Sequence, residues 1–224
     1  MADEVSSARV KAYGLDAGAS VVGIAAAKDF GPAPEGHKPS DVLEGCLSVI
    51  VLGSPFPKEV LLDTSLDYLE IRREMIEKME AIAKGMAKHI KQKGYAAKAI
   101  SPMGGKYADG KYYGHISLKH AAELAGLGRI GRNYILINPL YGSLLWFSAV
   151  LTNADLSPDT KARHTVCGGC TLCVTMCPSK ALDNPGAFEW KKCDKTMFKM
   201  VDKKRKMQCL VCRTVCPHRF GAAT

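Results

Sequence analysis

The sequence predicts an α+β fold in two parts: an α/β layer domain over residues 1–155, followed by a smaller cysteine-rich module over residues 156–224. Three observations predict it. Helical and apolar strand-like patterns alternate along the first part. From Asp155 onward the sequence changes to cysteine, lysine and short apolar segments. The second part also holds all but one of the nine cysteines of the chain.

The first half of the layer domain contains clear helix and strand patterns. Residues 3–17 predict a helix that ends at Gly18, and SVVGIAA after it predicts a short buried strand. Prolines and glycines predict a loop over residues 29–40, and LSVIVLGS, from Leu47, predicts a second strand. A long amphipathic helix ending near Gly94 follows, because apolar residues recur every three or four positions. These residues are Tyr68, Ile71, Met75, Met79, Ile82, Met86 and Ile90.

The second half of this domain continues the alternation. The strand YAAKAIS precedes a loop rich in glycine and tyrosine, PMGGKYADGKYYGH. The segment ISLKHAAELA predicts a helix, and after GLGRIG come the strand NYILIN, the turn PLYGS and the strand LLWFSAVLT. Helices that alternate with apolar strands are typical of a layered α/β domain.

Composition and charge narrow the class of protein. No apolar run is long enough to cross a bilayer, and the N-terminal residues lack the apolar core of a secretory signal. We therefore expect a cytoplasmic protein with no membrane partner, in which cysteines bind metal rather than form disulfides. The net charge is +9, and the stretch 191–206 contributes +6 of it. This stretch is expected to compensate anionic metal centres; an acidic protein partner or a nucleic acid is the alternative.

The cysteines form two groups. The first has the spacing C-x2-C-x2-C-x3-C-P and comprises Cys167, Cys170, Cys173 and Cys177. The second comprises Cys193 and, in the spacing C-x2-C-x3-C-P, Cys209, Cys212 and Cys216. The first spacing is typical of bacterial ferredoxins, in which the fourth cysteine binds the other of two iron–sulfur clusters. The sequence therefore predicts two [4Fe-4S] clusters.

By analogy with ferredoxins, each site takes its fourth ligand from the other group. One predicted site uses Cys167, Cys170, Cys173 and Cys216. The other uses Cys193, Cys209, Cys212 and Cys177. Only Cys46 is left, and we expect it to be an inert buried thiol. Two zinc tetrathiolate sites are the alternative, although zinc ligands usually occur as separated C-x2-C pairs.

The segment GLGRIG matches the dinucleotide-binding pattern G-x-G-x-x-G, but its context is reversed. That pattern requires a preceding strand and a following helix, whereas here a helix precedes and a strand follows. We therefore do not expect a nicotinamide site. Gly126, Gly128 and Gly131 instead predict a tight helix-to-strand passage that lets backbone approach a cofactor.

The run LKHAAELAGLGRIGRNYILINPLYGSLLWFSAVLTNADL, followed by the two cysteine groups, resembles the catalytic core shared by epoxyqueuosine reductases and reductive dehalogenases. The resemblance implies a nitroreductase-like α/β domain that holds cobalamin and a ferredoxin-like module whose two [4Fe-4S] clusters deliver electrons to it. SVVGIA and LSVIVLG are similar to the early strands of the family, so the resemblance covers most of the chain. The chain ends soon after Cys216, and we expect a short form without the helical-repeat extension that engages tRNA.

The resemblance also implies roles for individual residues. The corrinoid is expected to contact Gly126, Gly128, Gly131, Arg132, Tyr141, Gly142 and Ser143. The position of the catalytic aspartate of epoxyqueuosine reductase falls near Tyr112 in an alignment without gaps. Dehalogenases of the family use a tyrosine as proton donor, so Tyr112 or Tyr113 is the candidate, followed by His115. The alternative is that both tyrosines only pack against a cofactor.

These residues lead to three hypotheses about function. In the preferred one, an external low-potential donor of the ferredoxin or flavodoxin type reduces the clusters, and electrons pass through a corrinoid to an organic small-molecule substrate. In the second, the protein is a ferredoxin-like electron carrier that reduces a partner enzyme or a corrinoid protein. In the third, a flavin such as FMN replaces cobalamin. No D-x-H-x-x-G motif supplies a histidine for cobalt, and tRNA is doubtful as a partner without the extension.

Overall fold

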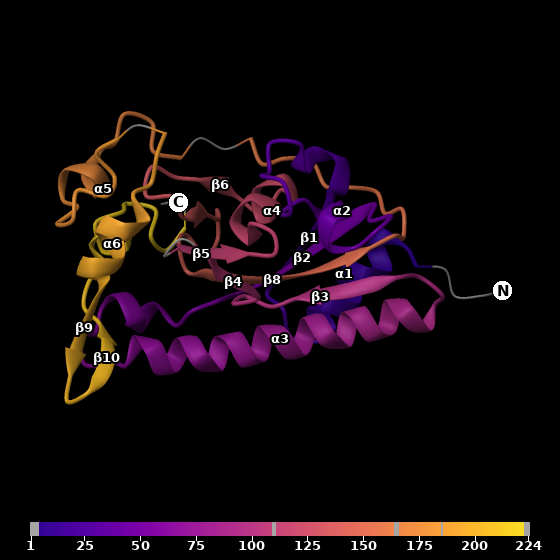
Figure 1. Ribbon diagram of the computed structural model, residues 1–224, viewed down its shortest axis with the longest axis horizontal. Helices are drawn as coiled ribbons and strands as arrows, with labels where there is room; N and C mark the ends of the chain where they lie inside the picture. Colours follow the sequence, from indigo (N-terminus) through magenta and orange to yellow (C-terminus); the bar gives the residue numbers. More distant parts are fainter. Residues whose placement is uncertain (1–4, 109–110, 164–165, 185, 222–224) are drawn as a thin grey trace.

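The computed structural model describes residues 5–108, 111–163, 166–184 and 186–221 (Figure 1). Its centre is a four-stranded sheet with the order β1-β2-β8-β3. The strands are β1 (Val21–Ala26), β2 (Ser48–Pro55), β8 (Leu145–Thr152) and β3 (Ala97–Ile100). All neighbouring strands in this sheet are antiparallel. The sheet therefore lacks the parallel β-α-β unit that a dinucleotide site on GLGRIG would require.

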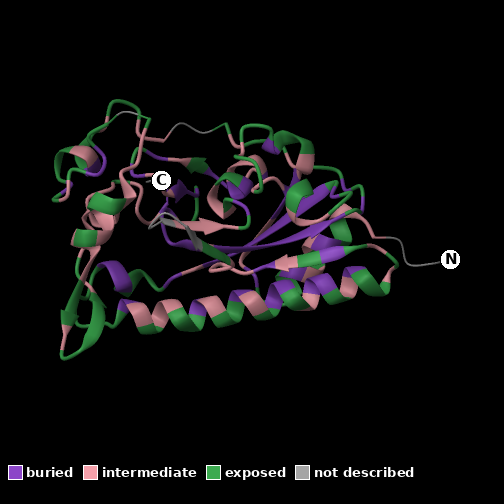
Figure 2. Cartoon of the chain, viewed as in Figure 1, coloured by how far each residue is buried: buried purple, intermediate pink, exposed green. Residues whose placement is uncertain are grey.

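The inner strand β2 is covered on both faces. Its side chains alternate between two cores: Val49 and Val51 face one, and Ile50 and Leu52 face the other. A strand buried on both faces needs apolar residues at every position, which is why this segment reads as an unbroken apolar run. Figure 2 shows the buried residues concentrated in this sheet and on the helix surfaces that face it.

Three helices form the layers on either side of the sheet. Helices α1 (Ser7–Asp16) and α3 (Tyr68–Gln92) contribute to the core with Ile50 and Leu52, and α4 (Leu118–Leu124) contributes to the opposite one. The long helix α3 buries Met79, Met86 and Ile90 completely, as its periodicity predicted. The helix predicted over residues 3–17 is confirmed for Ser7–Asp16, and residues 3 and 4 lie outside the described residues. Within the described ranges, no helix combines the length and the apolar character needed to cross a membrane.

The connections between these layers contain short elements that sequence patterns did not predict. They are η1 (Ala27–Phe30), α2 (Pro39–Val42), η2 (Lys58–Leu61), β4 (Gly105–Ala108), β5 (Lys111–Gly114) and β6 (Arg129–Ile130), whereas β7 (Leu136–Ile137) lies within the predicted strand NYILIN. The predicted tyrosine-rich loop thus contains the β4–β5 hairpin. The strand predicted over NYILIN is reduced to β7, because the chain turns at Tyr134, which has a φ of 58°. The Asn133 side chain stabilises that turn by accepting a hydrogen bond from the backbone of Ile135 at 3.2 Å.

The cysteine-rich module lies beside one end of α3 (Figure 1). It contains α5 (Leu172–Thr175), α6 (Trp190–Met197), β9 (Phe198–Val201), β10 (Lys204–Met207) and α7 (Val211–Thr214). The lysine-rich stretch therefore forms a helix and an antiparallel hairpin rather than an unstructured run. Helices α5 and α7 contact each other, and β10 contacts α3.

Hydrogen bonds fix the C-terminal segment to the layer domain. The backbone N–H of Ser143 donates to the carbonyl of Arg219 at 3.1 Å, and the Arg213 guanidinium donates to the carbonyl of Ser143 at 2.7 Å. Between these bonds the chain passes directly against Gly142, where an added Cβ would lie 2.3 Å from backbone atoms of Arg219. The turn PLYGS is thus the surface on which the end of the module docks.

We predict that Gly142→Ala lowers the free energy of unfolding by about 1–3 kcal/mol, because the new methyl group meets backbone that cannot rotate away. Its φ of 56° adds strain for any residue with a Cβ. Thermal unfolding followed by circular dichroism measures the change. Gly31→Ala is the matched control, since its φ is −47° and no atom lies within 4 Å of the added Cβ. Equal melting temperatures for both variants would contradict the docking role of Gly142.

Candidate functional site

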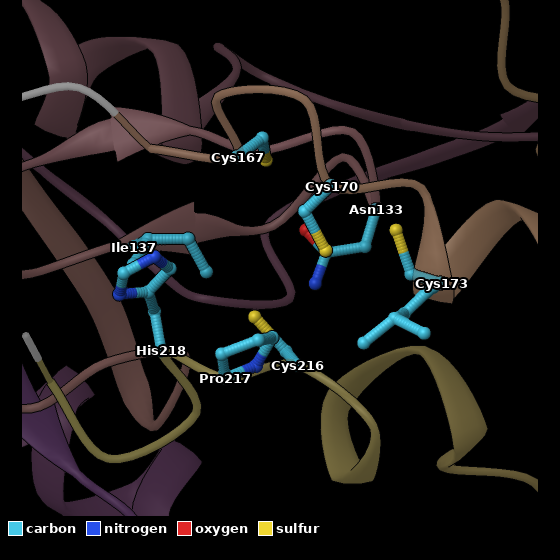
Figure 3. Close-up of a pocket in the computed structure, with 9 residues that line it drawn as sticks. Asn133, Ile137, Cys167, Cys170, Cys173, Cys216, Pro217 and His218 are labelled. Atoms are coloured by element: carbon cyan, nitrogen blue, oxygen red, sulfur yellow. The ribbon is translucent and has the colours of Figure 1, made fainter. Parts of the chain in front are cut away.

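Four cysteines from two distant segments line one pocket: Cys167, Cys170, Cys173 and Cys216. Figure 3 shows their sulfur atoms around a common space, with Asn133, Pro217 and His218 in the walls. Cys173 lies on α5, and Cys216 follows α7. The backbone N–H of Arg132 donates a hydrogen bond to the Cys167 sulfur at 3.3 Å. Such N–H donors stabilise the negative charge on metal-bound thiolate sulfur.

The other four cysteines of the module line a second, larger cavity: Cys177, Cys193, Cys209 and Cys212. The two sites are neighbours, because Cys173 and Cys177 belong to one buried cluster that also contacts Cys193 and Cys212. The Asn133 side chain lines both spaces and donates to the carbonyl of Cys212 at 3.0 Å. The structure thus groups the cysteines as the crossed arrangement predicts; their role as cluster ligands stays a prediction.

Burial raises the pKa of several of these thiols, and neighbouring cysteines raise it further. Burial and then Cys209 and Cys177 raise the pKa of Cys193 to about 11. Burial raises the pKa of Cys212 to about 12. A buried thiolate is unfavourable without a cation beside it, so these cysteines need a positively charged partner to become ligands.

Cys173 and Cys177 differ in their electrostatic surroundings. Burial, followed by the thiols of Cys167, Cys216 and Cys170, raises the pKa of Cys173. Burial also acts to raise the pKa of Cys177, but hydrogen bonds to its sulfur, chiefly from the Ser179 hydroxyl, together outweigh it and lower the pKa. The thiols that perturb Cys173 are the same ones that share its pocket, in agreement with the grouping.

The spacing of the sulfur atoms bears on the choice between zinc and iron–sulfur clusters. Among the described residues, no three His, Cys, Asp or Glu side chains converge closely enough to hold a single metal ion. A tetrathiolate zinc site needs four sulfurs about 2.3 Å from one ion, whereas a cluster places its ligands around a larger body. The choice of clusters over zinc stays a prediction from the cysteine spacing.

The second cavity has a volume of about 330 Å³ and lies between the module and the layer domain. Its walls combine the four cysteines with Tyr112 and with a set of aromatic side chains. These are Tyr68, Tyr134, Trp146, Phe188, Trp190 and Phe198. The volume and the predominance of apolar surface are typical of a small-molecule or cofactor site.

The three candidate catalytic residues lie on or just after β5, but they point in different directions. Tyr112 lines the cavity. Tyr113 follows it on the same strand, and successive side chains of a strand point to opposite faces. The ring of Tyr113 lies 5.6 Å from that of His37, and His115 is exposed beyond the hairpin. Of the three, only Tyr112 is brought to the cavity.

The residues predicted to contact a corrinoid do not line this cavity. Gly126 and Gly128 instead allow close backbone contacts: an added Cβ would lie 2.4 Å from the carbonyl oxygens of Thr160 and Ile137, respectively. Gly131 and Arg132 lie against Cys167. Tyr141, Gly142 and Ser143 belong to the turn on which the C-terminal segment docks. The positive φ of the glycines at 126, 128 and 142 permits close packing between backbone segments. Gly131 and Arg132 contact the first cysteine site.

Sequence reasoning missed several residues of the site. Asn133, Arg72 and Trp146 all line the second cavity, but each comes from a segment that sequence analysis assigned only to a helix or a strand. The signal available was Asn133, a polar residue at the start of the predicted strand NYILIN, directly after GLGRIGR. Cys46, in contrast, behaves as expected: its thiol is buried, remote from the module, and burial raises its pKa.

Comparisons with known proteins found similar sequences and similar folds. No family model matches the chain. The epoxyqueuosine reductase of Bacillus subtilis is 28% identical over 165 residues, which are 69% of this chain and 39% of that protein. The structure of a Bacillus subtilis epoxyqueuosine reductase covers 96% of this chain, with a TM-score of 0.68 and 22% identity. A catabolic reductive dehalogenase covers 88% of it, with a TM-score of 0.67 and 22% identity.

The chain spans only part of these relatives. It covers 65% of the solved Bacillus subtilis epoxyqueuosine reductase and 30% of the dehalogenase. At these identities the structural likeness shows a shared mixed α+β fold. Together with the sequence match, it shows that the chain is similar to part of the length of epoxyqueuosine reductases and shares the fold of these enzymes and of reductive dehalogenases.

Proposed function

We propose that the protein is an iron–sulfur oxidoreductase that passes electrons through two [4Fe-4S] clusters to a corrinoid, which reduces an organic substrate. The observation that carries this proposal is the second cavity. Its walls include one complete set of four cysteines and Tyr112. A cluster on these cysteines and a proton donor at Tyr112 would face the same cavity, which is the arrangement that a reductase needs.

The cysteine sites fit clusters in ligand type, number and charge. A cluster with four thiolate ligands carries a net negative charge, and basic side chains lie close to it. Arg213 lines the second cavity, and the backbone of Arg132 donates to Cys167. The exposed lysines of α6, β9 and β10 add positive charge around the second site. These cations stabilise an anionic centre that low-dielectric surroundings would otherwise disfavour.

The cavity also fits a flat organic cofactor. Tyr134 and Phe188 stack with their ring centroids 5.5 Å apart, and the walls are mainly apolar. The enclosed volume of about 330 Å³ is at the low end for ligand sites. A corrinoid would therefore extend into the open mouth of the cavity. When bound, it would supply a redox centre for single electrons.

The chain's own residues would orient and protonate the substrate. Tyr112 would hold its proton beside the reacting atom, and the aromatic walls would exclude water from it. In an alignment without gaps, the position of the catalytic aspartate of epoxyqueuosine reductase falls near Tyr112, and the dehalogenases provide the precedent for a tyrosine donor. The substrate class we propose is an organic compound with a reducible carbon–halogen or carbon–oxygen bond.

Two other functions have specific support. The enclosed volume favours a smaller cofactor such as FMN over a whole corrinoid. The β9–β10 hairpin favours an electron carrier, because it connects Cys193 to Cys209 and presents exposed lysines together with Met200, which is 66% exposed. An acidic redox partner, including the external low-potential donor, would dock there by salt-dependent attraction.

We predict that protein purified without oxygen contains about eight irons and eight sulfides per chain, as two [4Fe-4S] clusters require. Cys167→Ser and Cys216→Ser should each leave about four irons, and the double variant also about four, because both residues serve one cluster. Cys167→Ser combined with Cys177→Ser should leave almost none. Iron and acid-labile sulfide analysis measures these contents.

The control for this series is Cys46→Ser, which should retain all of the iron, since Cys46 is remote from the module. Zinc in a colourless protein would refute the cluster assignment. Loss of both clusters in the Cys167 and Cys216 double variant, with retention of one in the Cys167 and Cys177 variant, would refute the crossed arrangement and leave the clusters intact as a proposal.

The cofactor is tested by adding hydroxocobalamin or FMN to protein whose clusters are complete. We expect one equivalent of corrinoid to remain after equilibrium dialysis, because the cavity provides a flat apolar surface beside the second cluster. Visible spectra identify what is bound. Retention of FMN alone would replace the corrinoid with a flavin. Binding of neither, with rapid electron exchange to an acidic redox protein, would favour the carrier and contradict the enzyme.

Tyr112→Phe should slow turnover by about 100-fold or more, because it removes the proton donor while retaining the ring. Tyr113→Phe is the matched control and should retain turnover, since that ring points away from the cavity. The assay is the oxidation of reduced methyl viologen in the presence of an aryl halide or an epoxide. If both variants turn over at the wild-type rate, Tyr112 only packs against the cofactor.

A further inference from the structure

Two polar atoms in the wall of the second cavity lack any hydrogen-bond partner among the described residues: Nε of Arg72 and Nε1 of Trp146. Both atoms are buried. Each is an N–H that can only donate a hydrogen bond. Buried donors are almost always satisfied in folded proteins, and an unsatisfied one costs free energy. These two atoms therefore indicate an acceptor that the protein chain itself does not supply.

The Arg72 guanidinium is held in place but not neutralised. Its Nη2 donates to the Met103 sulfur at 3.2 Å, and its central carbon lies 5.6 Å from the centroid of the Trp146 ring. No carboxylate lies within ion-pair distance of it among the described residues. Arginine stays charged in proteins, so a positive charge faces the cavity without a counter-ion.

The other charged residues of the cavity do not compensate Arg72. Of the described residues that line it, Asp194 alone is acidic, and it forms an ion pair of 3.1 Å with Arg205. Arg213 is turned toward the carbonyl of Ser143. Apart from the negative charge of the proposed cluster, the side chains of the cavity thus carry a net positive charge, and Arg72, beside Trp146, has no counter-ion among the described residues. A water molecule could accept one hydrogen bond there but would leave the charge uncompensated.

We propose that Arg72 and Trp146 form an oxyanion-binding corner, so that the ligand of this cavity carries a carboxylate or phosphate group beside a flat apolar body. An oxyanion accepts from both donors at once and neutralises the guanidinium, and the aromatic walls contact the rest of the ligand. This inference rests on the proposed use of the cavity as the reaction site. The oxyanion can belong to the substrate or to a phosphate of the cofactor.

Binding of benzoate and its neutral isostere benzamide tests the corner, with cluster-containing protein and no added cofactor. Isothermal titration calorimetry at constant ionic strength should show benzoate binding at least tenfold tighter than benzamide. Arg72→Gln should abolish this preference, a change of about 10- to 100-fold for a lost charge-assisted hydrogen bond. Trp146→Phe keeps an aromatic ring, removes the N–H donor and should reduce the preference by about two- to tenfold.

The matched control is Arg73→Gln, the next residue on α3. Arg73 is exposed and pairs with Glu70 at 3.4 Å, so this variant removes the same charge from outside the cavity and should keep the preference. Iron content and thermal unfolding establish that each variant is folded with its clusters. Equal affinities for benzoate and benzamide, absence of binding by both, or an unchanged preference in Arg72→Gln would overturn the proposal.

A second pair of probes identifies the source of the oxyanion. FMN and riboflavin differ only in the phosphate. If FMN binds tighter than riboflavin, depends on Arg72 and displaces benzoate, the corner holds a cofactor phosphate. If both flavins bind alike or neither binds, while benzoate still depends on Arg72, the corner holds an acidic substrate. Loss of the clusters in the wild-type protein would refute the proposed function, whereas the benzoate comparison alone decides the corner.

Discussion

The docking of the C-terminal segment onto the layer domain is the constraint on which the site depends. Asn133 and Ser143, both in the domain, bond to backbone of the segment that contains Cys212 and Cys216. These contacts bring the last cysteines back to the first group, and two of the residues that make them, Asn133 and Cys212, also line the second cavity. Gly142 permits them, because only a residue without a Cβ allows the two backbones to approach so closely.

The same docking explains why the two cysteine sites of the module have different surroundings. The pocket with Cys216 lies against the turn around Arg132, where backbone N–H groups are available. The cavity with Cys212 opens toward α3 and the aromatic side chains of the domain. Electrons that enter at the exposed hairpin would meet the second site first, within reach of Tyr112. Burial raises the pKa of Cys193 and Cys212, so these thiols would need a metal centre to ionise, and assembly of the proposed clusters would then be coupled to folding of the module.

Individual residues illustrate what local patterns could and could not predict. The regular recurrence of apolar residues up to Ile90 predicts α3, since helix periodicity is a local property. The close spacing of Cys167, Cys170 and Cys173 predicts a common site, because this spacing is also a local property of the sequence. The glycines of GLGRIG lie beside an antiparallel sheet and contact backbone and Cys167, whereas their contact with a cofactor stays a prediction. The residue types alone do not reveal what approaches them.

By itself, the sequence determined the α+β class, the buried strand β2, the long helix α3 and the two groups of cysteines, because each depends on spacing within a short segment. Only the tertiary structure decided that Tyr112 rather than Tyr113 reaches the cavity, and that Arg72 and Trp146 meet there. Those outcomes depend on which face of a hairpin, a helix and a strand is turned inward. That choice is made by contacts between segments far apart in the chain, which no local pattern records.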